Sequence, residues 1–245
     1  MTRPLAILAT SALLWCAVGC AEPGAPVTPT PVPAPVPESP APIPMPMPPV
    51  AASATYEVTF ESHWSAATHP TDFPDDAHYS GLIGGTHNAE VEFWREGQLA
   101  SEGIRRMAER GAKAPLDDEV NQAIGRRQAE FLLSGGALAR SPGTITMEFT
   151  VSRTHPLVTL VTMVAPSPDW FVGVAGLPLF GDGDWRSAVA VDLYAFDAGT
   201  DSGRTYRAPD EESRPRQPIA RISGYPLTGS SADVSFGRMT FRRKG

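Results

Sequence analysis

The sequence predicts a mainly β fold, an antiparallel β-sandwich with a short helical insertion after its first strand. Short segments in which apolar and polar residues alternate, or in which apolar residues run together, recur at fairly regular spacing along the second half of the chain. Gly, Pro and Asp are frequent between these segments. Both cysteines, Cys16 and Cys20, lie close to the N-terminus, so neither a disulfide nor a cysteine-bound zinc ion holds the rest of the chain together. These features favour an antiparallel sandwich over a parallel sheet.

Residues 1–19 are predicted to be a lipoprotein signal peptide. Arg3 precedes an uncharged apolar run that is too short to span a bilayer as a mature anchor. The small residues Ala17 to Gly19 then precede Cys20, a pattern that resembles the bacterial lipoprotein cleavage site, and Cys20 would carry the lipid. The alternative is an ordinary secretory signal, because alanine stands where leucine is usual in that pattern.

Residues 20–53 are predicted to be the lipidated cysteine and a proline-rich linker. Between Pro23 and Val50 proline recurs at nearly every second or third position, and Glu38 is almost the only charge. Because proline fixes φ and lacks an amide donor, we expect a solvated polyproline-II spacer. A ligand for proline-reading domains is the alternative. Ala21, in place of aspartate after the cysteine, favours outer-membrane delivery in a double-membrane bacterium.

Residues 54–245 are predicted to form one folded domain. The first strand covers residues 55–64, where apolar and polar residues alternate. Residues 65–97 are rich in Pro, Asp, His and Gly, which is typical of long ordered loops.

Two helices are expected next. Ser101 is a suitable N-cap for a helix over residues 102–110, and Gly111 is placed to end it. Apolar residues at helical spacing predict a second helix over residues 116–133, closed by the glycines that follow. We expect this insertion to pack on an edge or an end of the sandwich.

The remainder is predicted to be β structure. Six further strands are expected, separated by turn residues, and they cover residues 144–151, 156–164, 170–174, 188–196, 219–223 and 234–241.

The charge balance argues against nucleic-acid binding. The formal net charge is −7, and the only lysines are Lys113 and Lys244. Such a chain offers no positive surface for a phosphate backbone. Anionic membrane surfaces are excluded as electrostatic partners for the same reason.

No catalytic motif stands out. The sequence has no His-Glu-x-x-His helix, no phosphate-binding Gly-rich loop with lysine and no Gly-x-Ser-x-Gly turn. Residues 201–203, Asp-Ser-Gly, resemble the surroundings of a serine-protease nucleophile, but no histidine with a matching context accompanies them. Four histidines of the loop-rich region have a spacing that fits no metal motif, which favours hydrogen-bonded loop histidines; they are His63, His69, His78 and His87.

Three aspartates are the best candidates for a functional site. Asp169 lies between two predicted strands, and Asp197 and Asp201 directly follow another. Loops at one end of a sandwich lie together, so the three carboxylates could converge on a hard cation such as Ca²⁺. The alternative is that each aspartate stabilises its own turn. Residues 181–184, Gly-Asp-Gly-Asp, lack the further ligands of an EF-hand and are interpreted as a hairpin turn.

Several segments together resemble the spondin N-terminal domain of F-spondin and mindin. The match covers most of the folded part, and its motifs are residues 56–60 (YEVTF), 82–84 (LIG), 86–88 (THN), 93–94 (FW), 108–111 (AERG), 165–174 (APSPDWFVGV) and 192–203 (DLYAFDAGTDSG).

The resemblance implies an extracellular β-sandwich similar to calcium-dependent lipid-binding domains, with bound Ca²⁺ and no catalysis. The metal aspartates of the family match Asp169, Asp197 and Asp201. A further ligand, a glutamate on the strand before the Pro-Ser-Pro-Asp loop, is matched by Thr150, which implies a weaker site or one completed by water. The family's thrombospondin repeats are missing from this sequence, so an integrin partner is not carried over.

These observations lead to one functional hypothesis. We expect a calcium-binding adhesion or recognition module without catalytic activity, held to a membrane through lipidated Cys20 in the cell envelope, at the outer membrane or cell surface. Its ligand would be a surface protein or a glycan. A structural envelope protein whose metal only stabilises the fold is the first alternative, and a hydrolase with an unrecognised acid pair is the second.

Overall fold

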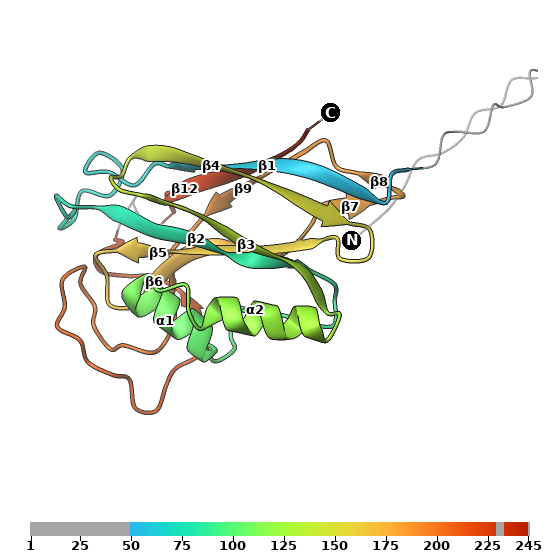
Figure 1. Cartoon of the computed structure of the whole chain (residues 1–245). Helices are drawn as coiled ribbons and strands as arrows, with labels where there is room; N and C mark the ends of the chain where they lie inside the picture. Colours follow the sequence, from blue (N-terminus) through green and yellow to red (C-terminus); the bar gives the residue numbers. More distant parts are fainter. Residues whose placement is uncertain (1–49, 229–232, 245) are drawn as a thin grey trace, which may run out of the picture. The chain divides into compact units, whose positions relative to one another are not determined.

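The computed structural model describes residues 50–228 and 233–244. The predicted signal peptide, Cys20 and nearly all of the predicted linker therefore lie outside the described residues. The described elements form two facing sheets with two helices on the outer side of one sheet (Figure 1).

Every strand pair is antiparallel. The four-stranded sheet has the order β4 (Gly143–Ser152), β1 (Ser53–Ser62), β12 (Gly237–Arg243) and β9 (Ala188–Leu193). The six-stranded sheet has the order β11 (Ala220–Arg221), β10 (Phe196–Asp197), β6 (Trp170–Pro178), β5 (Leu157–Ala165), β2 (His78–His87) and β3 (Ala129–Leu138). A separate hairpin joins β7 (Phe180–Gly181) to β8 (Asp184–Trp185). The predicted mainly β, antiparallel sandwich is confirmed.

The six-stranded sheet is buried on both faces. In β5, Val158 and Leu160 face the core between the sheets, whereas Val161 and Met163 face the helices. This is why β5 is apolar along nearly its whole length instead of alternating.

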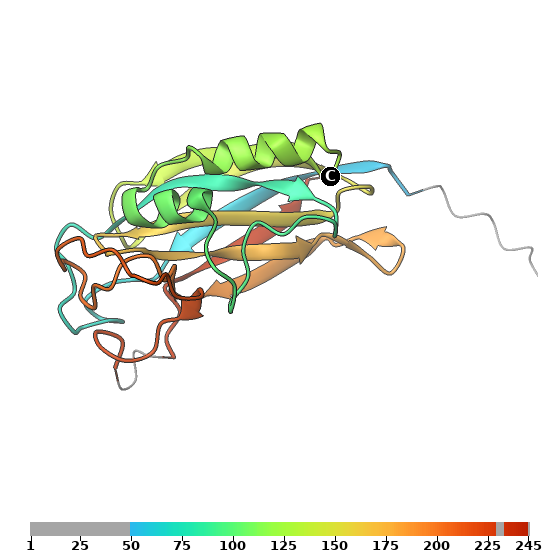
Figure 2. The same cartoon turned by 90° about the horizontal axis from the view of Figure 1, so that it is seen from below.

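The helices, α1 (Glu102–Arg110) and α2 (Leu116–Gly125), cover the outer face of this sheet (Figures 1 and 2). They follow β2, not the first strand, and they pack on a face, so the predicted position at an edge or an end was wrong. The physical reason is the second apolar face of the sheet, which has to be covered.

The first helix is as predicted and the second is shorter. The Ser101 hydroxyl accepts the Ile104 N–H at 3.1 Å, and Gly111 ends α1 with φ 63°. The predicted helix over residues 116–133 was wrong in its second half, because the chain turns at Arg127, with φ 60°, and residues 129–138 pair with β2 instead. Short apolar runs do not by themselves separate helix from strand, and here the sheet pairing decides.

The predicted loop over residues 65–97 contains β2, a central strand. The sequence pattern does not indicate this strand because it contains several glycines, whereas strands are usually rich in β-branched residues. A Cβ on Gly84 would lie 2.0 Å from the carbonyl oxygen of Thr159, so the neighbouring strand β5 can approach only a glycine here.

The predicted strand over residues 188–196 is split between the two sheets. β9 pairs with β12, and the chain then crosses at residues 194–195 so that β10 pairs with β6. This crossing places Asp197 opposite Trp170.

The hairpin turn predicted at residues 181–184 is confirmed. Asp182 and Gly183 both have positive φ, at 54° and 84°, as a tight two-residue turn between antiparallel strands requires.

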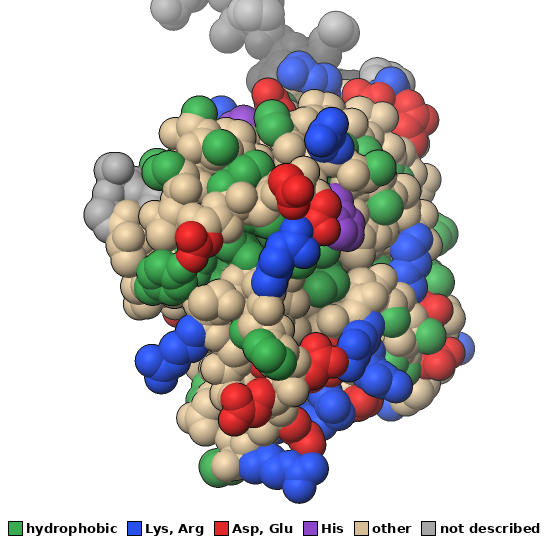
Figure 3. Space-filling model, turned by 90° about the vertical axis from the view of Figure 1, so that its left-hand side faces the viewer, with side chains coloured by type: hydrophobic (Ala, Val, Ile, Leu, Met, Phe, Trp, Pro, Cys, Tyr) green, Lys and Arg blue, Asp and Glu red, His purple; other side chains and the backbone are tan. Residues whose placement is uncertain are grey.

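The two ends of the sandwich differ. Loops 65–77 and 198–219 lie at the end where β6 begins (Figures 1 and 2). Figure 3 views this end and shows acidic and basic side chains interleaved on it. The described chain enters at the opposite end, where the Trp185 indole N–H donates to the Ala51 carbonyl at 2.9 Å.

Candidate metal centre

Asp169, in the turn between β5 and β6, is fully buried. Its Oδ2 accepts three hydrogen bonds, from the Thr200 N–H at 2.7 Å, the Asp201 N–H at 3.0 Å and the Thr200 hydroxyl at 3.1 Å. Its Oδ1 is also buried but has no hydrogen-bond partner among the described residues. Oδ2 thus has a full set of hydrogen-bond donors. Oδ1 has none, and a buried oxygen of this kind is expected to have a partner, which a bound cation could provide.

Asp197 lies in β10, beside this turn. Its Oδ1 accepts the Gly199 N–H at 2.7 Å. Burial raises the pKa of Asp197, and the negative charge of Asp201 raises it further, against the lowering effect of the Gly199 N–H. The Trp170 indole N–H is directed at the same carboxylate and lowers its pKa, without reaching hydrogen-bond geometry.

The negative charge of Asp197 disfavours the ionisation of Asp169. Burial, and then the charge of Asp197, raise the pKa of Asp169 to about 7, although the donors from Thr200 and Asp201 lower it. A buried acid beside a half-buried one is costly when both are anions, and a divalent cation bound to both would reduce that cost.

Asp201 has a different environment. Its Oδ1 accepts the Gly203 N–H at 2.8 Å, and its Oδ2 accepts the Glu211 N–H at 2.9 Å. Both oxygens therefore fix the loop from residue 201 to residue 211. In the part of the chain that the structure describes, no group of three or more His, Cys, Asp or Glu side chains is close enough to hold a metal ion. The structure brings the three aspartates to one end, with Asp169 and Asp197 as the pair whose oxygens are less fully used.

Aromatic packing fixes this end to the core. The Tyr206 ring lies 5.2 Å from the Trp170 ring and 5.4 Å from the Trp64 ring, measured between centroids. Since Trp64 and Trp170 are buried, the loops that carry the aspartates rest on a rigid platform.

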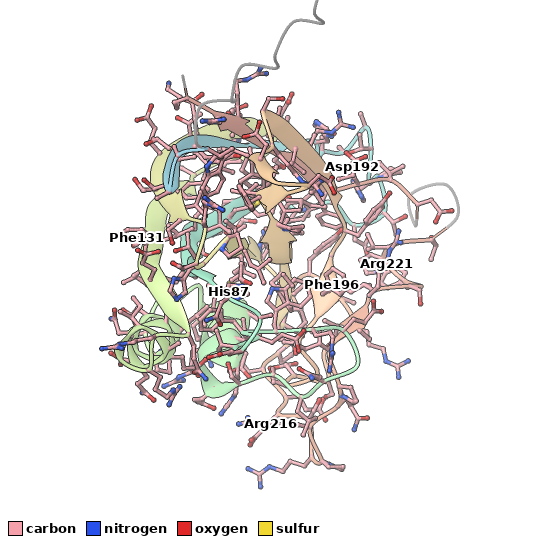
Figure 4. The ribbon with its side chains drawn as sticks, turned by 90° about the vertical axis from the view of Figure 1, so that its right-hand side faces the viewer. His87, Phe131, Asp192, Phe196, Arg216 and Arg221 are labelled. Carbon is pink, nitrogen blue, oxygen red and sulfur yellow. The ribbon has the colours of Figure 1, made fainter. Side chains whose placement is uncertain are left out.

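A cavity of about 600 Å³ opens beside Asp197 and Asp201. Its walls come from the start of β6, the loop after β10 and the chain around β11. Figure 4, which views the domain from the opposite end, shows Phe196 and Arg221, from the paired strands β10 and β11, next to each other. Ser202 also lines the cavity, and none of the described residues that line it is a histidine.

The comparison with known proteins decides the family. A family model described as Spondin_N matches residues 54–236. The chain belongs to the Spondin_N family.

Its curated relatives agree with this assignment. Human Spondin-2 is 38% identical over 176 residues, which cover 70% of this chain and 53% of the relative. Rat Spondin-2 is 36% identical over 174 residues, 69% of this chain and 53% of the relative. Human Spondin-1 is 37% identical over 181 residues, 70% of this chain and 22% of the relative. The chain thus matches about half or less of each relative's length, and the resemblance read from the sequence motifs is confirmed.

Thr150 lies far from the three candidate aspartates. It lies in β4 of the other sheet, paired with Thr55 near the start of β1. Asp169 follows the far end of β5, so one strand length, on the order of 30 Å, separates them. The expectation that Thr150 stands at a ligand position was wrong, because β4 and β5 form a connected pair that runs in opposite directions.

The four histidines are separate and locally bonded, as the sequence favoured. His87 contacts the Thr159 hydroxyl at 2.8 Å and the Asn88 carbonyl at 2.8 Å, and His78 contacts the Asp76 carbonyl at 2.7 Å. His69 contacts the Thr68 hydroxyl at 2.9 Å, and His63 lies 3.8 Å from Glu61.

Sequence reasoning missed the groups that hold the aspartates. Thr200 supplies two donors to Asp169, and Gly199 supplies the donor to Asp197. Gly199 has φ 73°, and a Cβ there would lie 2.0 Å from the Gln217 carbonyl oxygen. The presence of a glycine and a threonine between Asp197 and Asp201 could have indicated a turn whose amides donate to the aspartates. Nothing in the pattern around Arg221 indicated its place in the cavity.

Proposed function

We propose that the domain binds a calcium ion between Asp169 and Asp197. The supporting observation is the fully buried Asp169 Oδ1, which has no partner in the described residues and lies beside a second acid. Carboxylate oxygens are hard ligands, which suits Ca²⁺, and the remaining positions of its six to eight would be filled by backbone carbonyls and water. Asp201 would act mainly by fixing the loop that supplies the Thr200 and Asp201 amides.

We further propose that this calcium-organised end is a recognition surface, and that the protein is a non-catalytic adhesion module. Membership of the Spondin_N family supports this reading. A bound ion would neutralise Asp169 and Asp197 and hold the cavity wall at Asp197 in one conformation. The function therefore depends on the loops around the ion and on no chemical step.

The predicted leader and linker support a tethered location. Processing at Cys20 would give a lipid anchor in the cell envelope, at the outer membrane or cell surface, and the proline-rich segment would act as a spacer. Among the described helices, none has the length and apolarity needed to cross a bilayer. The described chain begins at the end of the sandwich remote from the aspartates, so a tether would join the domain at that end.

The recognition role predicts ligand binding that requires calcium. The full mature chain is applied to an array of glycans and matrix proteins, with calcium and with chelator. We expect at least one specific signal that falls tenfold or more on chelation and in Asp197→Asn. Asp182→Asn, an exposed aspartate in the β7–β8 turn, is the matched control and should bind normally. Binding that is indifferent to chelator would instead support a metal that only stabilises the fold.

The anchor predicts a second, independent result. In a double-membrane bacterium, Cys20→Ser should lose fatty-acid labelling and move the protein from the membrane fraction to the soluble fraction, because stable anchoring needs the acyl chains. Cys16→Ser is the matched control within the leader and should stay labelled. Membrane retention of an unlabelled Cys20→Ser protein would refute the lipid anchor.

A further inference from the structure

Arg221, in the cavity wall, presents a guanidinium that forms no ion pair with any acidic residue of the described chain. Its central carbon lies 3.7 Å from the centre of the Tyr194 ring. Glu96 contacts only the backbone N–H of Arg221, at 3.2 Å, and no ion pair of the Arg221 side chain occurs within the described residues. Stacking occupies the flat face of a guanidinium and leaves the donors on its edge free for a planar acceptor such as a carboxylate.

The rest of the cavity has the character of a sugar site. Tyr225 contributes a half-exposed ring to the wall, and Ser213, Gln217 and Ser223 contribute groups that can donate and accept hydrogen bonds. The volume of about 600 Å³ lies within the range of roughly 300–1,000 Å³ that small-ligand sites occupy. An aromatic face together with short polar side chains matches a ring that carries hydroxyl groups.

The charges that line the cavity indicate which charge a bound sugar would carry. Arg204 and Arg221 are the cations that line the cavity, and Asp197 and Asp201 are the anions. These four charges balance, and a divalent cation at Asp169 and Asp197 would leave the cavity positive. A positive cavity with a stacked arginine favours an anionic ligand.

We propose that this cavity binds an acidic sugar, a uronic acid residue of a glycan, with its carboxylate on the edge of Arg221 and its ring against Tyr225. The inference rests on the calcium site proposed above, because the ion supplies the positive excess. Arg204 adds long-range attraction, and the serine and glutamine side chains contact the hydroxyl groups.

Titration of the full mature chain with methyl β-D-glucuronide tests the inference. Methyl β-D-glucoside is the matched probe, since it differs only at the carboxylate. Heteronuclear NMR follows the tryptophan indole N–H signals, and Trp170 lines the cavity. In calcium, the glucuronide should bind at least tenfold more tightly than the glucoside, and chelator should weaken it. Arg221→Gln should weaken glucuronide binding about tenfold or more, because a hydrogen-bonded charge pair is lost.

Controls separate this inference from the calcium site. Calcium binding by calorimetry should be unchanged in Arg221→Gln, and Arg140→Gln, an exposed arginine outside the cavity, should bind glucuronide normally. Calcium binding without glucuronide binding, or an unaffected Arg221→Gln, overturns the sugar site and leaves the metal site standing. Equal binding of N-acetylaspartate amide overturns the assignment to a sugar in favour of an acidic peptide. A chain that takes up no calcium overturns the metal site itself.

Discussion

Asp169→Asn should abolish the gain in thermal stability that calcium gives the wild-type domain, and Asp197→Asn should do the same. At free calcium a hundredfold above its dissociation constant, binding to the folded state alone adds ~2.7 kcal/mol to the free energy of unfolding. For a domain of this size that corresponds to a rise in Tm on the order of 5–10 °C. Asparagine keeps an oxygen that can accept the Thr200 and Asp201 amides but lacks the charge that holds the ion.

Asp182→Asn isolates the effect of the site from the effect of the substitution. Asp182 is exposed and has a φ of 54°, which asparagine tolerates. It belongs to the Gly-Asp-Gly-Asp turn at residues 181–184, away from the three candidate aspartates. Thermal unfolding with calcium and with chelator should show the full calcium gain in this variant. An equal gain in wild type, Asp169→Asn and Asp197→Asn would show that calcium binds elsewhere.

The second large effect is a fall in stability with rising pH in the metal-free protein. The pKa of Asp169 is raised to about 7 in the folded state, mainly by burial, against about 3.9 in an unfolded chain. The folded state therefore holds an extra proton between these values, and the free energy of unfolding decreases as pH rises through this window. The limiting slope is ~1.4 kcal/mol per pH unit for one such group. Below about pH 4 the contribution is complete, and above about pH 7 it is lost.

Chemical denaturation across this pH range, in chelator, measures the effect. Burial lowers the pKa of His69 and of His87, so these histidines make stability rise with pH near neutrality and oppose the trend. Asp169→Asn contains the same histidines, so the difference between wild type and variant isolates the aspartate. The free energy of unfolding of wild type, minus that of the variant, should fall by several kcal/mol from acid to neutral pH, as the linkage between folding and proton binding requires. A difference in the free energy of unfolding that does not change with pH would mean that folding leaves the pKa of Asp169 unshifted, and would contradict the prediction.

The strands with regular patterns were predictable, and those under special constraints were not. Residues 55–64 alternate because β1 has one face in the core, and the pattern gave its position. β2 was missed because Gly84 is needed for the close approach of β5, and glycine carries no strand signal. The first half of β3 was predicted as helix because Phe131 and Leu132 continue the helical spacing of the apolar residues in α2, and only pairing with β2 distinguishes the two structures.

The gathering of the three aspartates at one end of the sandwich was predictable, but the hydrogen bonds that each of them makes were not. Loop ends of a sandwich meet, which was enough to group Asp169, Asp197 and Asp201. The crossing from β9 to β10, which sets Asp197 opposite Trp170, depends on sheet pairing that no local pattern records. The hydrogen bonds that engage both oxygens of Asp201 but only one oxygen of Asp169 are likewise a product of the folded loop.

The most direct test is a crystal structure of the domain grown in saturating calcium, with the ion located by its anomalous scattering. The account predicts an ion within ~2.3–2.6 Å of Asp169 Oδ1 and of an Asp197 oxygen. An Asp169 Oδ1 that remains without a ligand at saturating calcium, or an ion bound only in another part of the domain, would contradict it.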